Sequence, residues 1–277
     1  MTFQMTVFRR DVHPCYVVLL LCLVVCALFA FTATRSIDCP ATTHTQNLSA
    51  YYQCFDRTRA AEEVLKRFRS FYPYSEIIMV NDGGNKALSF LAMEYSAKYL
   101  YSDRTSSEDH GMYFSSWKKG AVYIERIIQA SKNCDWLILL EDDVWLLSNI
   151  PLQTMCFDIN GAHSWLLLPE CLMDVVRARN PSLQKSGRMQ YAGNGGSVLR
   201  CSFFNGLNNV NWKQDLPSLF IARDGYLASD EMLSSLTYIY GGSIGPYYSF
   251  CQPNYLTFLF KYMTGSISVL HEVKVLY

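Results

Sequence analysis

The sequence predicts an α/β protein in which helices cover both faces of a mostly parallel sheet. Two short, continuous apolar runs, Ile77–Val80 and Trp136–Leu140, have the length and composition of strands that are buried on both faces. Segments with apolar residues at helical spacing precede and separate these runs. Strands that alternate with helices are typical of this architecture.

The elements can be justified in chain order. Residues 58–72 place apolar side chains on one helical face, and Pro73 ends this helix. The first apolar run leads into a tight turn at Gly83-Gly84. In order, the expected elements are a helix at 58–72, a strand at 77–80, a helix at 85–101, a helix at 116–133 and a strand at 136–140.

Composition excludes two classes of protein. The chain has 277 residues, of which 50% are hydrophobic and 17% charged, which argues against disorder. It carries 24 basic and 24 acidic side chains, whereas a nucleic-acid-binding protein normally has a basic face.

A membrane anchor is expected near the N-terminus. Residues Cys15–Ala33 contain no charge and no proline, and as a helix they would span about 28 Å. Arg9 and Arg10 precede the segment, which favours a cytoplasmic N-terminus. A cleaved signal peptide is the alternative. The expected organisation is a tail at 1–14, an anchor at 15–34, a stem at 35–55 and a globular domain at 56–277.

The cysteines agree with an oxidising compartment. Seven lie beyond the apolar segment with no C-x-x-C pair, so a zinc site is not expected and up to three disulfides are. A disulfide between Cys156 and Cys171 would close a small loop, although connectivity does not follow from sequence. Asn47 begins the N-x-S/T sequon that we expect to be glycosylated.

Acidic side chains follow both predicted strands. Glu141, Asp142 and Asp143 come directly after one strand, and Asn81-Asp82 end the other. In a parallel sheet these ends lie on the same edge, where ligands bind. Adjacent carboxylates repel one another, and a divalent cation that also holds phosphates would relieve the repulsion. A solvated acidic loop and an Asx-type turn at Asp82 are the alternatives.

"LILLEDDV" (137–144) resembles the D-x-D region of GT-A glycosyltransferases, particularly the E-D-D variant of inverting N-acetylglucosaminyltransferases. "IIMVNDGGN" (77–85) is similar to the first nucleotide-binding turn of that fold. The resemblance covers about residues 73 to 274. It implies a GT-A-like, Rossmann-like fold and a type II membrane enzyme of the Golgi or ER, with its catalytic domain in the lumen.

The resemblance also implies roles for individual residues. Asp143 would be the principal ligand of Mn²⁺ or Mg²⁺, and His271 a further ligand. Asp142 and Glu141 would contact the ribose or a metal-bound water. The remaining donor-side candidates are Asn81 and Asp82 at the uracil or ribose, and Lys118 or Lys119 and Lys274 at the diphosphate. For Lys118, Lys119 and His271, a structural or solvated role is the alternative.

Two further segments are candidates for the acceptor side. In "YAGNGGSVLR", Asn194, Gly195 and Gly196 are expected beside the acceptor, because glycines let backbone approach a ligand closely. An ordinary hairpin turn is the alternative. Asp230, or else Glu231, is expected to act as the general base. Helix capping behind Ser229 would also explain both acids.

The expected function is therefore the transfer of a sugar, from a donor that is most simply a UDP-sugar, to a hydroxyl of a glycan, glycoprotein or glycolipid. Inversion is favoured because a base candidate exists and no nucleophile stands out. Two alternatives stay open: a non-catalytic, membrane-anchored glycan-binding relative, and another carboxylate–metal enzyme such as a nucleotidyltransferase or phosphohydrolase.

Overall fold

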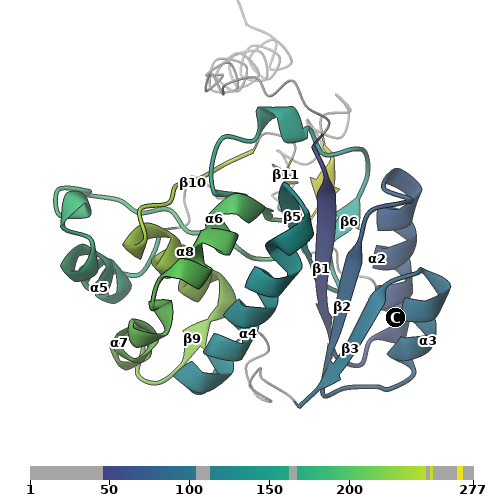
Figure 1. Cartoon of the computed structure of the whole chain (residues 1–277), viewed down its shortest axis with the longest axis horizontal. Coiled ribbons are helices and arrows are strands. Elements are labelled where there is room, and N and C mark those ends of the chain that lie inside the picture. The colour runs from purple at the N-terminus through teal and green to yellow at the C-terminus, as the bar shows by residue number, and fades with distance from the viewer. Residues whose placement is uncertain (1–45, 104–112, 162–166, 248–249, 252–266, 271–277) are drawn as a thin grey trace, which may run out of the picture. The chain divides into compact units, whose positions relative to one another are not determined.

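The computed structural model describes residues 46–103, 113–161, 167–247, 250–251 and 267–270. In this part of the chain a seven-stranded sheet has the order β10-β7-β8-β5-β1-β2-β3 (Figure 1). Its strands are β1 (Leu48–Cys54), β2 (Ile77–Asp82), β3 (Lys98–Ser102), β5 (Trp136–Leu140), β7 (Ile159–Asn160), β8 (Val198–Arg200) and β10 (Ile244–Gly245).

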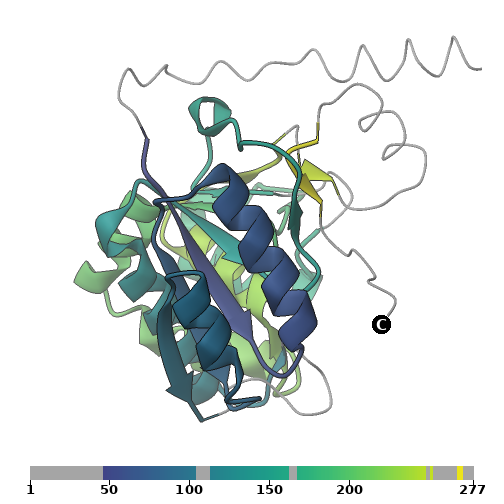
Figure 2. The same cartoon turned by 90° about the vertical axis from the view of Figure 1, so that its right-hand side faces the viewer.

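Helices cover both faces of the sheet (Figures 1 and 2). On one face α2 (Thr58–Phe71) and α3 (Leu88–Glu94) pack against the strands. The other face is covered by α4 (Trp117–Ala130), α5 (Glu170–Arg179), α6 (Cys201–Gly206), α7 (Leu216–Ala222) and α8 (Ser229–Ile239). Short 3₁₀ turns occur at Ser131–Asn133, Leu152–Thr154, Pro181–Leu183, Leu207–Asn209 and Trp212–Gln214.

Alternation along β5 explains why an unbroken apolar run forms a strand. Trp136, Ile138 and Leu140 pack into the core beneath α2, whereas Leu137 and Leu139 pack beneath α4. Successive side chains of a strand point to opposite faces, so a strand covered on both sides must be apolar throughout. Full burial of each such side chain contributes about 1.5–3 kcal/mol.

The strand directions determine what meets at the carboxyl edge of β5. β1 pairs in parallel with β2 and β5, and β2 pairs in parallel with β3, but β8 is antiparallel to β5. The residues that precede β8 therefore lie beside the residues that follow β5. This arrangement brings the glycine segment at 193–196 to the acidic triplet.

Two small sheets lie beside the main one in the described part of the chain. β4 (Tyr113–Phe114) pairs with β9 (Leu227–Ala228) and ties the start of α4 to the start of α8. β12 (Val269–Leu270) pairs with β6 (Trp145–Leu146), which follows the acidic triplet, and with β11 (Phe250–Cys251).

The helix expected at 85–101 is wrong in extent. The helix α3 ends at Glu94, and the chain turns at Ser96, whose φ is +51°, before it continues as edge strand β3. The strand pairs in parallel with β2. Tertiary pairing with β2 prevails there over the helical preference of the local sequence.

The stem boundary expected at residue 55 also needs correction. Residues 48–54, assigned to the stem from their polar neighbours, form β1, which is buried throughout between β2 and β5. Because the buried strand contains polar Ser49 and Gln53, its sequence does not read as a continuous apolar run. The other elements expected from sequence, α2, β2, α4 and β5, are confirmed.

The anchor predicted at 15–34 lies outside the described residues. Within the described ranges, no helix has the length and apolar character needed to cross a bilayer. The suggested pairing of Cys156 with Cys171 is wrong, because Cys171 carries a free thiol and Cys156 is disulfide-bonded elsewhere.

Candidate active site

The acidic triplet lies half-buried at the carboxyl end of β5. The Tyr52 hydroxyl of β1 donates a hydrogen bond to Asp142 Oδ1 at 2.6 Å. Burial raises the pKa of Asp142 to about 6, and the charges of Glu141 and Asp143 add to this, while Tyr52 and Arg57 act in the opposite direction. Asp142 is thus a largely buried carboxylate next to two like charges, and all three side chains of the triplet are half-buried.

Asp82 lies at the end of β2 with its side chain buried. Arg126 of α4 forms an ion pair with Asp82 Oδ1 at 3.2 Å and donates to the Ser102 hydroxyl at the end of β3. Burial raises the pKa of the Cys54 thiol at the end of β1, and the charges of Asp142 and Asp82 raise it further. The acids at the ends of β2 and β5 therefore lie at the same edge of the sheet, as expected for parallel strands.

Asn81 holds the turn that follows β2. Its amide nitrogen donates to the Asn85 carbonyl at 2.7 Å, and its amide oxygen accepts from Gly84 N–H at 2.7 Å. Gly84 cannot carry a side chain, because a Cβ there would lie 1.6 Å from the Phe55 carbonyl oxygen. The Asx-type role considered for Asp82 thus belongs to Asn81.

The glycine segment packs directly against the triplet. A Cβ on Gly195 would lie 2.6 Å from Val144 Cγ2 and 3.0 Å from Glu141 Cβ, and Gly196 N–H donates to the Leu139 carbonyl at 2.7 Å. Asn194 lies at the same turn, where its side-chain oxygen accepts from the Ser197 hydroxyl. The glycine segment therefore packs against the acidic triplet and is not an isolated hairpin turn.

Asp230 lies at the start of α8, where its Cα would be 3.5 Å from a Cβ on Gly193 of the glycine segment. Burial raises its pKa to about 6, and the carboxylates of Glu231 and Glu141 contribute, which shows that Asp230 and the triplet are electrostatic neighbours. Its Oδ1 accepts a hydrogen bond from Glu231 N–H at 2.8 Å. The helix itself begins at Ser229 behind Ala228, so the expected cap at Ser229 is one residue displaced.

Glu231 is occupied by other contacts. Arg223 pairs with both of its carboxylate oxygens, at 3.0 and 3.1 Å, and Ala228 N–H donates to it at 3.4 Å. A bidentate arginine pair and a contact to the helix N-terminus give Glu231 a role in holding the start of α8.

For the other residues predicted from sequence, the structure shows no contact with the acidic triplet within its described part. Lys118 is exposed in the first turn of α4, with its ammonium 5.8 Å from the centre of the Trp117 ring. The Lys119 N–H donates to the Ser116 hydroxyl oxygen, which caps the start of α4. His271 and Lys274 lie outside the described residues. Asn47 is exposed just before β1, and its side-chain nitrogen donates to the Asn133 carbonyl at 3.1 Å.

Three residues of the site escaped the sequence analysis. Tyr52 was hidden by the stem assignment at 35–55, Arg57 lies just before the predicted helix at 58–72 and was given no role, and Arg126 lies on a helix without other signals. One signal was present: Arg126 falls three residues after buried Tyr123 and next to Ile127, so it lies at the border of the apolar face of α4. A charge at that position must find a partner as the helix packs.

The donor set suits a hard divalent cation. Within the described ranges, no three His, Cys, Asp or Glu side chains are grouped so as to hold an ion by themselves. Mg²⁺ and Mn²⁺ in nucleotide sites commonly take one or two carboxylates together with phosphate oxygens and water. The half-buried carboxylates of Asp142 and Asp143, with the raised pKa of Asp142, fit such a site.

No family model matches the chain, and no curated protein does. Solved structures do match. The galactosyltransferase LgtC, in complex with donor and acceptor sugar analogues, aligns with a TM-score of 0.51 at 11% identity, over 82% of this chain and 87% of that chain. An active-site mutant of LgtC aligns with a TM-score of 0.51 at 13% identity, over 82% and 88%. The protein thus has a GT-A-like fold.

Proposed function

We propose that the protein is a metal-dependent glycosyltransferase that moves a sugar from a nucleotide-diphosphate donor, a UDP-sugar in the simplest case, to a hydroxyl of a glycan, glycoprotein or glycolipid. One observation carries the proposal: the glycine segment joins the end of β5 to the start of α8, because Gly195 packs on Glu141 and Gly193 lies beside Asp230. The likeness of fold to LgtC supports it.

Asp143 and Asp142 are the proposed ligands of Mn²⁺ or Mg²⁺. When bound, the ion supplies Lewis-acid stabilisation of the charge that develops on the leaving diphosphate. Tyr52 orients Asp142 through its hydrogen bond, and Glu141 contacts the ribose or a metal-bound water. A cation offsets the repulsion within this half-buried triplet, which is the physical reason for placing it there.

The nucleoside and diphosphate contacts are assigned to the flanking elements. Asp82, held in one orientation by Arg126, contacts the uracil or ribose, and the Asn81 turn supports it. Arg57, whose charge already acts on Asp142, joins Lys118 and Lys274 as a cation for the diphosphate. We keep His271 as a further metal ligand, because β12 directly before it pairs with Trp145–Leu146, close behind Asp143 in the chain.

Asp230 is the proposed general base. Its raised pKa of about 6 lets the carboxylate take a proton from an acceptor hydroxyl near neutral pH. Glu231 holds the start of α8 and so positions its neighbour. Asn194, Gly195 and Gly196 form the wall of the acceptor site. Direct attack by the activated hydroxyl inverts the anomeric carbon.

We also propose the topology expected from the sequence. The anchor at 15–34 places a short tail in the cytoplasm and the catalytic domain in the lumen of the Golgi or ER. The exposure of Asn47 supports its glycosylation there.

The test is donor turnover by the purified full-length chain. With a panel of nucleotide sugars, Mn²⁺ and mixed glycan acceptors, we expect release of nucleoside diphosphate, which Asp143→Ala abolishes without lowering the melting temperature. Asp174→Ala, an exposed acid on α5, is the matched control and should keep full turnover. Activity that survives both Asp143→Ala and EDTA contradicts the metal role, and release of pyrophosphate instead points to nucleotidyl transfer.

A further inference from the structure

Two cysteines lie at the end of the β5–β8 pair that is remote from the acidic triplet. Cys134 comes two residues before β5, and Cys201 directly follows β8 as the first residue of α6. Cys201 N–H donates to the Asp135 carbonyl at 2.9 Å, so the two segments are joined by backbone contact. Their sulfur atoms are 2.7 Å apart, although both residues carry free thiols.

This separation is close to that of a covalent bond. A disulfide has sulfurs about 2.05 Å apart, so the two atoms need to move by less than about 1 Å. Cys201 is buried and Cys134 is half-buried, and both are held by regular structure on either side. Little conformational entropy remains to be lost when the bond closes.

The two thiols differ in reactivity. Cys134 lines a cavity of about 570 Å³ together with Trp136, Cys156 and Arg200, whereas Cys201 is covered. The hydrogen bond between the two sulfurs lowers the pKa of Cys134 and raises that of Cys201, against the effect of burial on Cys134. Cys134 is therefore the thiolate that an external reagent meets first.

We propose that Cys134 and Cys201 are a disulfide-forming pair, in which Cys134 reacts through the cavity and Cys201 completes the bond. The Cys134 thiolate attacks a disulfide oxidant, such as glutathione disulfide or an oxidoreductase, and releases one thiolate from it. The Cys201 sulfur then attacks Cys134 in the mixed disulfide and expels the second thiolate, while its proton goes to solvent. The oxidant gains two electrons and the pair loses them.

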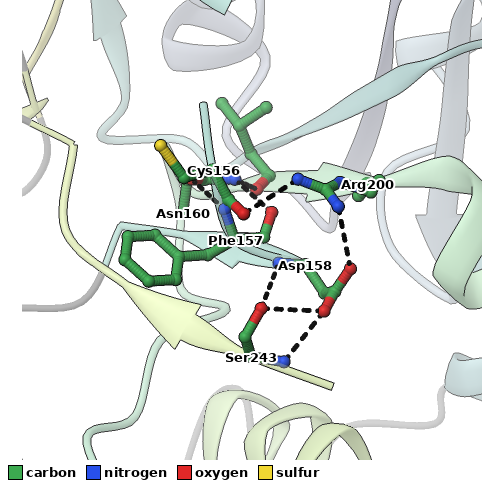
Figure 3. A network of polar contacts seen from close by, with 7 residues as sticks. Cys156, Phe157, Asp158, Asn160, Arg200 and Ser243 are labelled. Carbon is green, nitrogen blue, oxygen red and sulfur yellow. Dashed lines mark hydrogen bonds and ion pairs between the residues drawn. The ribbon is translucent and has the colours of Figure 1, made fainter. Parts of the chain in front are cut away.

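The bond joins the two strands that carry the candidate active site. At the end of β8, Arg200 donates to the Cys156 carbonyl at 2.9 Å and pairs with Asp158. Asp158 in turn accepts two hydrogen bonds from Ser243, which lies just before β10 (Figure 3). These polar contacts tie β8 to β7 and β10. The Cys134–Cys201 bond adds a covalent link to the hydrogen-bonded pair of β8 and β5, across 67 residues of chain.

The test begins with the reduced full-length chain in detergent. After incubation with glutathione disulfide and rapid alkylation, peptide mass mapping should give a linked Cys134–Cys201 peptide, lighter by two hydrogens than the separate peptides. With limiting maleimide and no oxidant, Cys134 should be labelled before Cys201. Quantitative alkylation of both thiols after oxidation would overturn the proposal, and this readout on the unaltered chain requires no variant.

Matched variants then measure the consequence of the bond. Oxidised Cys134→Ser should melt about 10 °C below the oxidised natural chain, as expected for a loop of this length. The exposed free thiol of Cys171 supplies the control, because Cys171→Ser should melt as the natural chain does. Equal melting of all three contradicts the stapling role. Sugar transfer, measured in parallel, reports on the proposed enzyme independently of this bond.

Discussion

At the scale of single residues, burial distinguishes the carboxylates of the candidate site from ordinary surface acids. Asp82 is paired with Arg126, and Glu231 with Arg223, so each of these carboxylates is stabilised as an anion by a cation. Asp142 and Asp230 instead have pKa values raised to about 6 by desolvation. Groups with raised pKa values in a shared site are candidates for chemistry, whereas the paired groups orient them.

The carboxylate of Asp230 provides a prediction with a defined pH dependence. As a base it must be ionised, so turnover at saturating donor and Mn²⁺ should fall about tenfold per pH unit below about pH 6 and level off above it. Asp230→Asn should retain donor binding, measured by calorimetry, while transfer falls by about 10²–10⁴-fold. An unchanged transfer rate removes Asp230 as the base.

Asp230→Asn, which should lower sugar transfer, should raise the stability of the fold. The folded-state pKa of Asp230 is raised, so its favourable contribution is present at low pH and is lost as the pH rises from about 4 through 6. At pH 7, Asp230→Asn should therefore raise the free energy of unfolding by on the order of 1–3 kcal/mol. Asp174 is exposed, so Asp174→Asn should change neither the transfer rate nor the free energy of unfolding.

At the scale of elements, the site depends on three segments that pack closely at one sheet edge. The glycine segment approaches β5 because β8 is antiparallel to it, and α8 begins where β9 joins β4. Gly193, with φ of +112°, lets the chain pass within van der Waals contact of Leu233 and Asp230. A side chain at Gly193 or Gly195 would push one segment away from the others.

The glycine contact can be tested by adding one methyl group. In Gly195→Ala the new Cβ would meet Val144 at 2.6 Å and Glu141 at 3.0 Å, so Glu141 must shift. We expect a loss of about 1–3 kcal/mol of stability and weaker donor binding, measured by denaturant unfolding and calorimetry. Gly187→Ala is the matched control, because no atom lies within 4 Å of its Cβ. Equal donor affinity in both variants would exclude the proposed contact.

At the scale of the whole molecule, β1 is the strand around which the sheet is organised. It pairs with β2 on one side and with β5 on the other, and its side chains enter both apolar cores. It also supplies Tyr52 to the candidate site. The globular domain therefore begins before residue 48.

This placement predicts where the chain can be shortened. A chain that begins at Tyr51 loses Leu48, Ser49 and Ala50, which pair with Trp136–Ile138 in the centre of the sheet. We expect it to be secreted poorly and to lack a cooperative melt, whereas a chain that begins at Cys39 should fold. Asn47→Gln in the longer chain controls for the lost sequon. Equal melting of the two truncated chains would contradict the central role of β1.

Much of the fold and part of the site could be predicted from local pattern. The strands β2 and β5 contain continuous apolar runs, and α2 and α4 each have one apolar face, so the local sequence predicts the burial of all four elements. β1 and β3 could not be found in this way. β1 contains polar Ser49 and Gln53, and β3 is a partly exposed edge strand whose sequence also suits a helix.

The sequence by itself determined the alternation of strands and helices, the GT-A-like class and the acidic triplet at a strand end, because these depend on neighbours within a few residues. Only the tertiary structure decided that Arg126 pairs with Asp82, that Tyr52 orients Asp142, and that Gly195 packs on Glu141. Each of these contacts joins segments more than 40 residues apart, and burial at the sheet edge selects them.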